Sequence, residues 1–287
     1  MRILLTGASG FVGGHLAPRL VEAGHDLVCA ARRSSGYEPP AGARLIELDL
    51  ARRLDAAALP EVDAILHLAQ ANARFPEGAR ELHGVNTAST LDLLDHARET
   101  GAKRFVYASS ASVYGFGDRP FKEDDPLAGR DFYAVTKINA ENLVQAYSDF
   151  LTTAVLRLVV PYGPGQEARM IPGLIGRVRE GTPVSLNAGG RPRMNPLYID
   201  DVVRALLGVL ELDESVALNV AGDEPVTVRE LAELIGSVVG REPVFEEGEG
   251  KVPGDLVVDT SRLHELLDLR PLVSLEEGLR RTAEETA

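Results

Sequence analysis

Residues 2–13 read RILLTGASGFVG, an apolar run that leads into three regularly spaced glycines. The run Arg2–Thr6 has the length of a buried strand, and Phe11–Ala23 has the periodicity of a helix, with Gly24 as a C-terminal stop. A glycine-rich turn between a strand and a helix exposes the N–H groups of the helix start to an anion. The stretch therefore predicts the first strand, turn and helix of a dinucleotide-binding fold, the alternative being a glycine-rich turn that binds nothing.

Apolar runs of strand length alternate with amphipathic stretches of helix length as far as residue 158. Besides Arg2–Thr6, the predicted strands are Leu27–Ala31, Arg44–Glu47, Ala64–His67, Phe105–Ala108 and Ala154–Leu158. The longer predicted helices are Ala79–Glu99 and Asp131–Phe150. This alternation is typical of an α/β protein with a Rossmann-type, doubly wound parallel sheet.

The pattern changes after Leu158, where the segment VVPYGPGQ is dense in proline and glycine. We expect a smaller substrate-binding lobe to begin there, interleaved with the sheet through a predicted helix at Tyr198–Leu210 and a strand at Ala217–Val220. The expected division assigns 1–165 and 198–222 to the dinucleotide-binding domain, and 166–197 and 223–287 to the C-terminal lobe. That lobe includes two further predicted helices, Val228–Val239 and Leu275–Glu284.

Composition excludes several classes of function. The 287 residues carry a net charge of −13, which disfavours binding to nucleic acid or to an anionic membrane surface. The chain has one cysteine, Cys29, which fits a reducing compartment, and its apolar runs are shorter than the ~18 residues of a membrane span. Its six histidines lack the spacing of a metal site. We expect a cytoplasmic protein without a metal.

The glycines fall at Gly7, Gly10 and Gly13, a GxxGxxG spacing. A dinucleotide site usually has a carboxylate about 20 residues further on, but the second predicted strand ends in Ala31-Arg32-Arg33. Arginine suits a 2′-phosphate, so the sequence favours NADP over NAD. Two solvated arginines are the alternative.

A tyrosine and a lysine stand four residues apart in YAVTK, Tyr133 to Lys137, on one face of a predicted helix. A nearby ammonium favours the phenolate and lowers a tyrosine pKa from ~10, which makes Tyr133 a candidate general acid and base. An exposed aromatic beside a solvated cation is the alternative. Serines follow the fifth predicted strand, where open α/β sheets bind their ligands.

Together these motifs resemble the extended short-chain dehydrogenases/reductases, in particular the NAD(P)-dependent epimerase/dehydratase group that includes UDP-galactose 4-epimerase. The resemblance covers nearly the whole chain. It rests on TGASGFVG at 6–13, LDL at 48–50, HLA at 67–69, Asn86, SSASVYG at 109–115, YAVTK at 133–137, LRLVVPYGPG at 156–165 and YIDDVV at 198–203.

The resemblance implies a role for each matched position. Ser110, Tyr133 and Lys137 look like the catalytic triad, and Asn86 like a support for the lysine and the cofactor. The expected cofactor-binding residues are Gly7, Ser9, Gly10, Phe11, Val12, Gly13, Ala31, Arg32, Arg33, Asp49, Leu50, Leu68, Ala69, Gln70, Asn86, Ala108, Tyr133, Lys137, Pro161 and Tyr162. The expected substrate-binding residues are Ser110, Ala111, Ser112, Tyr133 and Arg193.

Three departures from the family pattern narrow the expected chemistry. Dehydratases of the group carry an Asp-Glu pair where this chain has Ala111-Ser112. The asparagine before the PYG segment is Val160, and the arginine of the usual RPGD is Val252. Lys251 or Arg193 are candidates to replace that arginine.

The implied function is epimerisation at C4 of a nucleotide sugar through a transient ketone, by a homodimer. The alternative is an NADP-dependent reductase or dehydrogenase of a keto-sugar or other carbonyl compound. A non-catalytic dinucleotide sensor is a further alternative, against which the intact Tyr133–Lys137 pair argues.

Overall fold

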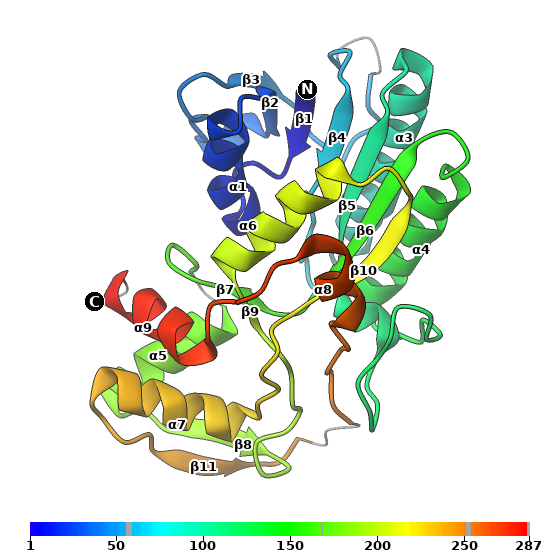
Figure 1. Cartoon of the computed structure of the whole chain (residues 1–287). Helices are drawn as coiled ribbons and strands as arrows, with labels where there is room; N and C mark the ends of the chain where they lie inside the picture. The colour runs from blue at the N-terminus through cyan, green and yellow to red at the C-terminus, as the bar shows by residue number, and fades with distance from the viewer. Residues whose placement is uncertain (56–58, 168, 251–253, 286–287) are drawn as a thin grey trace. The chain divides into compact units, whose positions relative to one another are not determined.

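A computed structural model of the chain describes residues 1–55, 59–167, 169–250 and 254–285 (Figure 1). The chain forms two compact units, and each is built from segments that are distant in sequence. The first consists of Met1–Val113, Leu127–Arg157 and Val203–Leu218. The second consists of Tyr114–Pro126, Leu158–Val202 and Asn219–Ala287.

The first unit is built on a seven-stranded sheet with the order β10-β6-β5-β4-β1-β2-β3. The pairings of β1 with β2 and β4, of β2 with β3 and of β4 with β5 are parallel, as the sequence predicts for a doubly wound fold. The strands are β1 (Arg2–Thr6), β2 (Asp26–Ala31), β3 (Arg44–Glu47), β4 (Ala64–His67), β5 (Arg104–Ser110), β6 (Thr152–Leu158) and β10 (Val216–Val220). The predicted Rossmann-type α/β fold is confirmed.

The helices of this fold follow the predicted order. They are α1 (Phe11–Glu22), α2 (Ala79–His83), α3 (Ser89–Thr100), α4 (Phe132–Ala146) and α6 (Ile199–Gly208). The predicted helix at 79–99 is interrupted by a π-helical segment, Gly84–Ala88, which contains Asn86. The other long helix is capped by Asp131, whose carboxylate accepts a hydrogen bond from the N–H of Ala134 (2.9 Å), and it ends four residues earlier than predicted.

The core of the first unit lies between the sheet and the pair α3 and α4, which lie side by side in Figure 1. Leu4, Ile65 and Phe105 of the sheet pack there against Leu93 of α3 and Val144 of α4. Strands covered on both faces must be apolar throughout, which explains the continuous apolar runs of the sequence. The packing fixes the carboxyl ends of the strands, where the predicted site residues stand.

The second unit contains two small parallel strand pairs and a group of helices. Strand β7 (Pro161–Tyr162) pairs with β9 (Leu197–Tyr198), and β8 (Val184–Asn187) pairs with β11 (Phe245–Gly248). The helices are α5 (Met170–Glu180), α7 (Val228–Val239), α8 (Ser261–Leu267) and α9 (Leu275–Glu285). Helix α7 starts with a capping box in which Thr227 and Glu230 satisfy each other's backbone N–H groups.

The compact units differ from the expected division at residues 114–126, 158–165, 198–202 and 219–222, which belong to the second unit rather than the first. Isolated bridges join Gly117 to Asp255 and Phe121 to Val258, and the rings of Tyr114 and Phe121 stack. The two bridges join segments more than 130 residues apart, so local sequence patterns do not reveal them.

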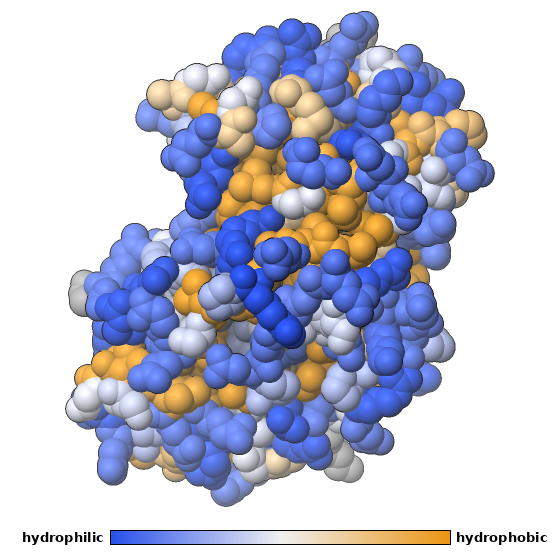
Figure 2. Space-filling view, in the orientation of Figure 1, coloured by the Kyte–Doolittle hydropathy of each residue, from blue (hydrophilic) through white to orange (hydrophobic). Residues whose placement is uncertain are grey.

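Hydrophilic residues cover most of the face shown in Figure 2. Among the described residues, no helix combines the length and the apolar character that crossing a bilayer requires.

Candidate active site

The glycine-rich turn forms a cradle at the start of α1. Gly7 adopts φ +74°, and a Cβ there would lie 2.6 Å from the backbone nitrogen of Ala69. A Cβ at Gly13 would collide with the Gly7 carbonyl. Gly10 is the N-cap residue of α1, and no side chain caps the first N–H groups of this helix. Backbone that approaches closely and uncapped N–H groups together fit the pyrophosphate of a dinucleotide.

A carboxylate not expected from the sequence, that of Glu47 at the end of β3, lies beside the end of β2. Arg33 donates through Nε to Glu47 Oε2 at 3.0 Å, and Glu47 is the register partner of Ala31. In a parallel sheet the carboxyl ends of β2 and β3 lie at the same edge, so the predicted strand Arg44–Glu47 already contained the signal. The arginine pair therefore does not stand alone at this edge.

Two neighbouring expectations have local explanations. The Asp49 carboxylate accepts from the N–H of Ala51 (3.1 Å) and pairs with Arg52 (3.1 Å), so it stabilises a turn. Leu50 is buried in the core next to it. After β4, Leu68 is nearly buried, and the N–H of Ala69 points to Thr6 Oγ1 at 3.4 Å.

Asn86 ties two parts of the site together from within the π-helical segment. Its Oδ1 accepts from the N–H of Ala71 (2.8 Å), and its Nδ2 donates to Thr136 Oγ1 (3.1 Å). Thr136 in turn donates to the carbonyl of Tyr133 (2.7 Å). The fully buried amide thus anchors the first turn of α4, and a π-helical insertion is a common way to aim a functional residue.

Lys137 is fully buried, and its Nζ donates to the carbonyl oxygen of Ala108 at 2.8 Å. The ammonium lies 4.8 Å from the ring centroid of Tyr107 and 5.9 Å from that of Tyr133. Burial lowers the pKa of Lys137 to about 7, an effect that the carboxylate of Glu141 opposes. The structure therefore brings the predicted tyrosine and lysine together at the end of β5.

Tyr133 and Ser110 are both half-buried at the carboxyl end of the sheet. The Tyr133 hydroxyl donates to Gln70 Oε1 at 2.6 Å. Ser110 Oγ accepts from the N–H of Ser112 at 3.2 Å, in the short 3-10 turn that begins at Ala111. Within the described part of the chain, the buried Ser112 hydroxyl has no hydrogen-bond partner, which is unusual for a buried polar group.

The remaining expected residues belong to the second unit. The Tyr162 hydroxyl donates to the carbonyl of Leu275 (3.3 Å), and burial raises its pKa. Pro161 precedes it in β7. The exposed Arg193 donates through its guanidinium to the carbonyl of Pro225 (3.3 Å). The candidates Lys251 and Val252 lie outside the described residues.

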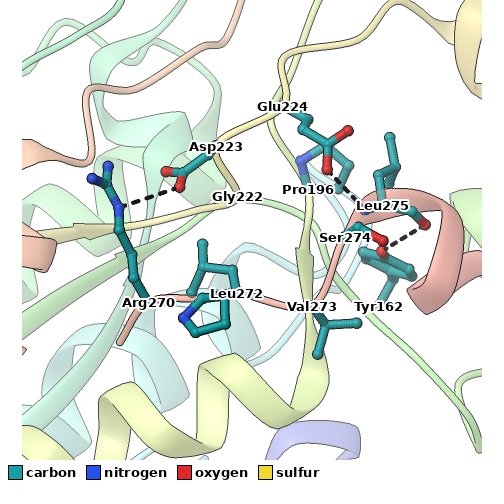
Figure 3. A pocket seen from close by; sticks show the side chains of 11 residues that line it. Tyr162, Pro196, Gly222, Asp223, Glu224, Arg270, Leu272, Val273, Ser274 and Leu275 are labelled. Atoms are coloured by element: carbon teal, nitrogen blue, oxygen red, sulfur yellow. Dashed lines mark hydrogen bonds and ion pairs between the residues drawn. The ribbon is translucent and has the colours of Figure 1, made fainter. Parts of the chain in front are cut away.

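The second unit also contains a pocket of about 550 Å³, shown in Figure 3, that the sequence analysis did not anticipate. Its polar groups bond to one another: Glu224 accepts from the N–H of Leu275 (3.0 Å), and Arg270 pairs with Asp223 (3.8 Å). Figure 3 shows these pairs on opposite sides of an apolar stretch that includes Leu272. The Asp223–Arg270 ion pair and the hydrogen bond from Leu275 to Glu224 hold these loops together.

Sequence analysis also missed a buried ion pair behind Lys137. Glu141 of α4 accepts from Arg157 of β6 at 2.7 and 3.1 Å, and from the hydroxyl of Ser109. The available signal was an arginine inside an otherwise apolar strand, since a charge at such a position needs a buried partner. Glu141 follows Lys137 by one helical turn, on the same face.

Comparison with known proteins places this geometry in context. UDP-glucuronate 4-epimerase from Thermodesulfobacterium geofontis is 27% identical, over 97% of this chain and 94% of its own length. The dTDP-4-dehydro-6-deoxy-D-allose reductase from Streptomyces bikiniensis is 28% identical, over 98% and 94%. The solved structure of MoeE5 in complex with UDP-glucuronic acid and NAD is 30% identical, covers 100% of this chain and 99% of its own, and superposes with a TM-score of 0.88.

The NAD dependent epimerase/dehydratase family matches residues 3–221, which include the glycine cradle, Ser110 and the Tyr133–Lys137 pair. The resemblance predicted from the motifs is confirmed. The chain is an enzyme that belongs to the NAD dependent epimerase/dehydratase family.

Proposed function

We propose that the protein is a sugar-nucleotide 4-epimerase that inverts the C4 hydroxyl through a transient ketone. The observation that carries this proposal is the pairing of Tyr133 with the buried Lys137 at the end of β5, beside Ser110. The cradle of Gly7, Gly10 and Gly13 fits the dinucleotide that such a reaction needs. A dinucleotide held by this cradle would supply a hydride acceptor for the oxidation of C4 and a hydride donor for its re-reduction.

The chain's own residues supply the proton chemistry. Tyr133 removes the proton of the sugar hydroxyl as the carbonyl forms, and returns it when the hydroxyl is restored. The ammonium of Lys137 stabilises the negative charge that the phenol oxygen acquires. Ser110 holds the same sugar oxygen by a hydrogen bond. Gln70, which accepts from the Tyr133 hydroxyl in the structure, gives way to the substrate oxygen.

The residues after Ser110 disfavour dehydration. Elimination of water from C5 and C6 needs a base next to the ketone and an acid for the leaving hydroxyl. Ala111 has no such group, and the Ser112 hydroxyl does not ionise near neutral pH. NMR of the products from nucleotide-linked glucose or mannose tests this point. The proposal predicts no 4-keto-6-deoxy sugar, and formation of that product at enzymatic rates would overturn it.

We propose NAD as the cofactor, in place of the NADP that the sequence favoured. That expectation depended on the lack of a carboxylate after β2, but Glu47 lies there and engages Arg33. A carboxylate accepts ribose hydroxyls and repels a 2′-phosphate. The NAD held by MoeE5 supports the same choice. NADP is the alternative, because the guanidinium of Arg32 could bind its 2′-phosphate.

The relatives support a proposal for the substrate class. Two of them act on or bind UDP-glucuronate, so we propose a UDP-sugar, with UDP-glucuronate and UDP-glucose as the first substrates to test. Incubation with each sugar and catalytic NAD, followed by NMR of the C4 proton, tests the proposal. Appearance of the C4 epimer at enzymatic rates supports it.

A net reductase of a keto-sugar is the second candidate, favoured by the likeness to the Streptomyces bikiniensis reductase. The two candidates differ in what happens to the cofactor. Mass spectrometry of freshly purified protein distinguishes them, because an epimerase restores its oxidised cofactor in each turnover and has no need to exchange it. Retained oxidised cofactor favours the epimerase, and an empty site favours the reductase.

We also propose that the protein is a homodimer formed through α3 and α4. Leu91 of α3 and Val135 of α4 are each 38% exposed, and a second copy packed on these helices would cover them. Light scattering at micromolar concentration measures the mass directly. A mass near twice 30.8 kDa supports the dimer, and 30.8 kDa excludes it at that concentration.

A further inference from the structure

The ion pair between Glu141 and Arg157 is the most deeply buried charge pair near the candidate site among the described residues, and the chemistry above leaves it unused. The side chains are 6% and 7% exposed. Desolvating two charges costs several kcal/mol for each ion, so a buried pair gives little net stability over apolar residues of the same volume. Its presence next to Lys137 therefore calls for a reason other than stability.

The carboxylate of Glu141 connects the two elements that carry the proton chemistry. On α4 it lies one turn after Lys137, and both side chains are buried. On β5 it accepts the hydroxyl of Ser109, the residue immediately before Ser110. One carboxylate thus holds the helix that positions the ammonium and the strand end that positions the serine.

The titratable groups near Lys137 belong to several elements, and most of them are neutral. His67 of β4 is neutral, since burial and the ammonium lower its pKa to about 3. Tyr107 of β5 is neutral as well, because burial raises its pKa well above 10. Tyr133 shares the helix with Lys137, and Arg157 of β6 adds a second positive charge. The negative charge that favours the ammonium is that of Glu141.

We propose that Glu141 is a positioning residue of the active site, which keeps Lys137 in its ammonium form and fixes the end of β5 beside Ser110. Arg157 fixes the position of the carboxylate through two hydrogen bonds. The effect of Glu141 on catalysis, through Lys137 and Ser110, rests on the proposed function. The charge state of Lys137, however, can be measured without any substrate.

The chain has four lysines, Lys103, Lys122, Lys137 and Lys251, which makes the measurement practical. Protein labelled at the lysine side chains is titrated from pH 5.5 to 10 by NMR, and the Lys137 signal is assigned from a Lys137→Arg variant. The wild-type signal is expected to titrate near pH 7. In Glu141→Gln the midpoint should fall, by about one pH unit, since the variant removes the negative charge that favours the ammonium.

Arg157→Gln is the matched control, because it breaks the same ion pair from the other side. Both single variants leave one buried charge without its partner, so a purely structural role predicts similar effects from both. The proposal predicts different effects on the Lys137 midpoint. Loss of the carboxylate in Glu141→Gln lowers the midpoint, and loss of the guanidinium in Arg157→Gln does not. A fall in both single variants, or in neither, would overturn the proposal.

Two further measurements keep the test decisive. If a single variant does not fold, the double variant Glu141→Gln/Arg157→Gln buries two amides and no unpaired charge. It should also show a lowered Lys137 midpoint, and an unchanged one would contradict the proposal. Ser109→Ala leaves the ion pair intact and should lower kcat at least fivefold with KM and the Lys137 midpoint unchanged. A wild-type kcat in this variant would show that Glu141 does not fix the end of β5 through Ser109. That conclusion holds for any substrate that the enzyme turns over.

Discussion

Lys137 Nζ lies 2.8 Å from the carbonyl oxygen of Ala108, so a hydrogen bond fixes the ammonium of α4 to the carboxyl-terminal part of β5. This hydrogen bond places the charge between the rings of Tyr107 and Tyr133. Because both atoms are buried, breaking this hydrogen bond would leave a donor and an acceptor without water to replace it, which costs free energy. The position of the lysine relative to the strand end is therefore a built feature of the fold.

The role of Tyr133 gives the first prediction. Tyr133→Phe should lower turnover at least ~100-fold, since the proton of the sugar hydroxyl loses its acceptor, while dinucleotide affinity changes little. Tyr147→Phe is the matched control, because it removes a hydroxyl bonded to Asp95 further along the same chain segment. Steady-state kinetics and calorimetry with NAD measure both effects. Wild-type turnover in Tyr133→Phe would show that another group moves the proton.

Burial of Lys137 predicts how stability depends on pH. Its pKa is about 7 in the folded protein and near 10.5 in the unfolded chain, so between these values the unfolded chain binds one more proton. The stability contributed by this group therefore increases as pH rises from 7 to 10.5, by up to about 1.4 kcal/mol per pH unit. Below pH 7 both states are protonated and the contribution is constant.

Urea unfolding of the wild type and of Lys137→Met at pH 7, 8 and 9 measures this dependence. The difference in unfolding free energy, wild type minus variant, should become more favourable to the wild type as pH rises. Lys103→Met, at an exposed position, is the control for the loss of a lysine at the surface. A flat difference for Lys137→Met would mean that the buried amine keeps an ordinary pKa.

The Arg33–Glu47 pair predicts the cofactor preference. The wild type should bind NAD more tightly than NADP in calorimetry, and Glu47→Gln should shift the ratio toward NADP by roughly tenfold, because it removes a repulsive carboxylate and releases Arg33. Glu38→Gln is the control at another glutamate of the same surface region. Tighter binding of NADP by the wild type would restore the choice made from the sequence.

Val160 predicts a stabilising substitution. This β-branched residue has φ +38°, in the left-handed region, at the position where the family often has asparagine. Asn tolerates that backbone conformation better, so Val160→Asn should raise the unfolding free energy by about 1 kcal/mol. Val244→Asn, at an exposed valine, is the control and should not stabilise the protein. Equal or lower stability of Val160→Asn in urea would show that side-chain packing outweighs the backbone strain.

Local patterns in the sequence were enough to predict the sheet and the centre of the site. The spacing of Gly7, Gly10 and Gly13 requires a strand, a turn and a helix in that order, and Tyr133 and Lys137 share a face by helical geometry alone. The conformation of the glycine turn and the shared helix face of Tyr133 and Lys137 depend on neighbours along the chain. Both could therefore be predicted from the sequence alone.

The features that the sequence did not reveal depend on contacts between distant segments. Glu47 reaches the end of β2 through strand register, and Arg157 of β6 meets Glu141 because α4 packs on the sheet. The segment 114–126 joins the second unit through bridges to residues 255 and 258. In each case the partner is set by the packed fold, which a linear pattern does not encode.

The central claim is that this enzyme inverts C4 of a nucleotide sugar without net oxidation or reduction. The most direct measurement uses UDP-glucuronate and UDP-glucose carrying deuterium at C4, with catalytic NAD, followed by NMR. The account predicts that the C4 epimer forms with the deuterium still on C4, because the same hydride leaves and returns while Tyr133 moves only the hydroxyl proton. Absence of the epimer from both sugars, with stoichiometric consumption of reduced cofactor on a 4-keto sugar, would contradict the account and identify a reductase.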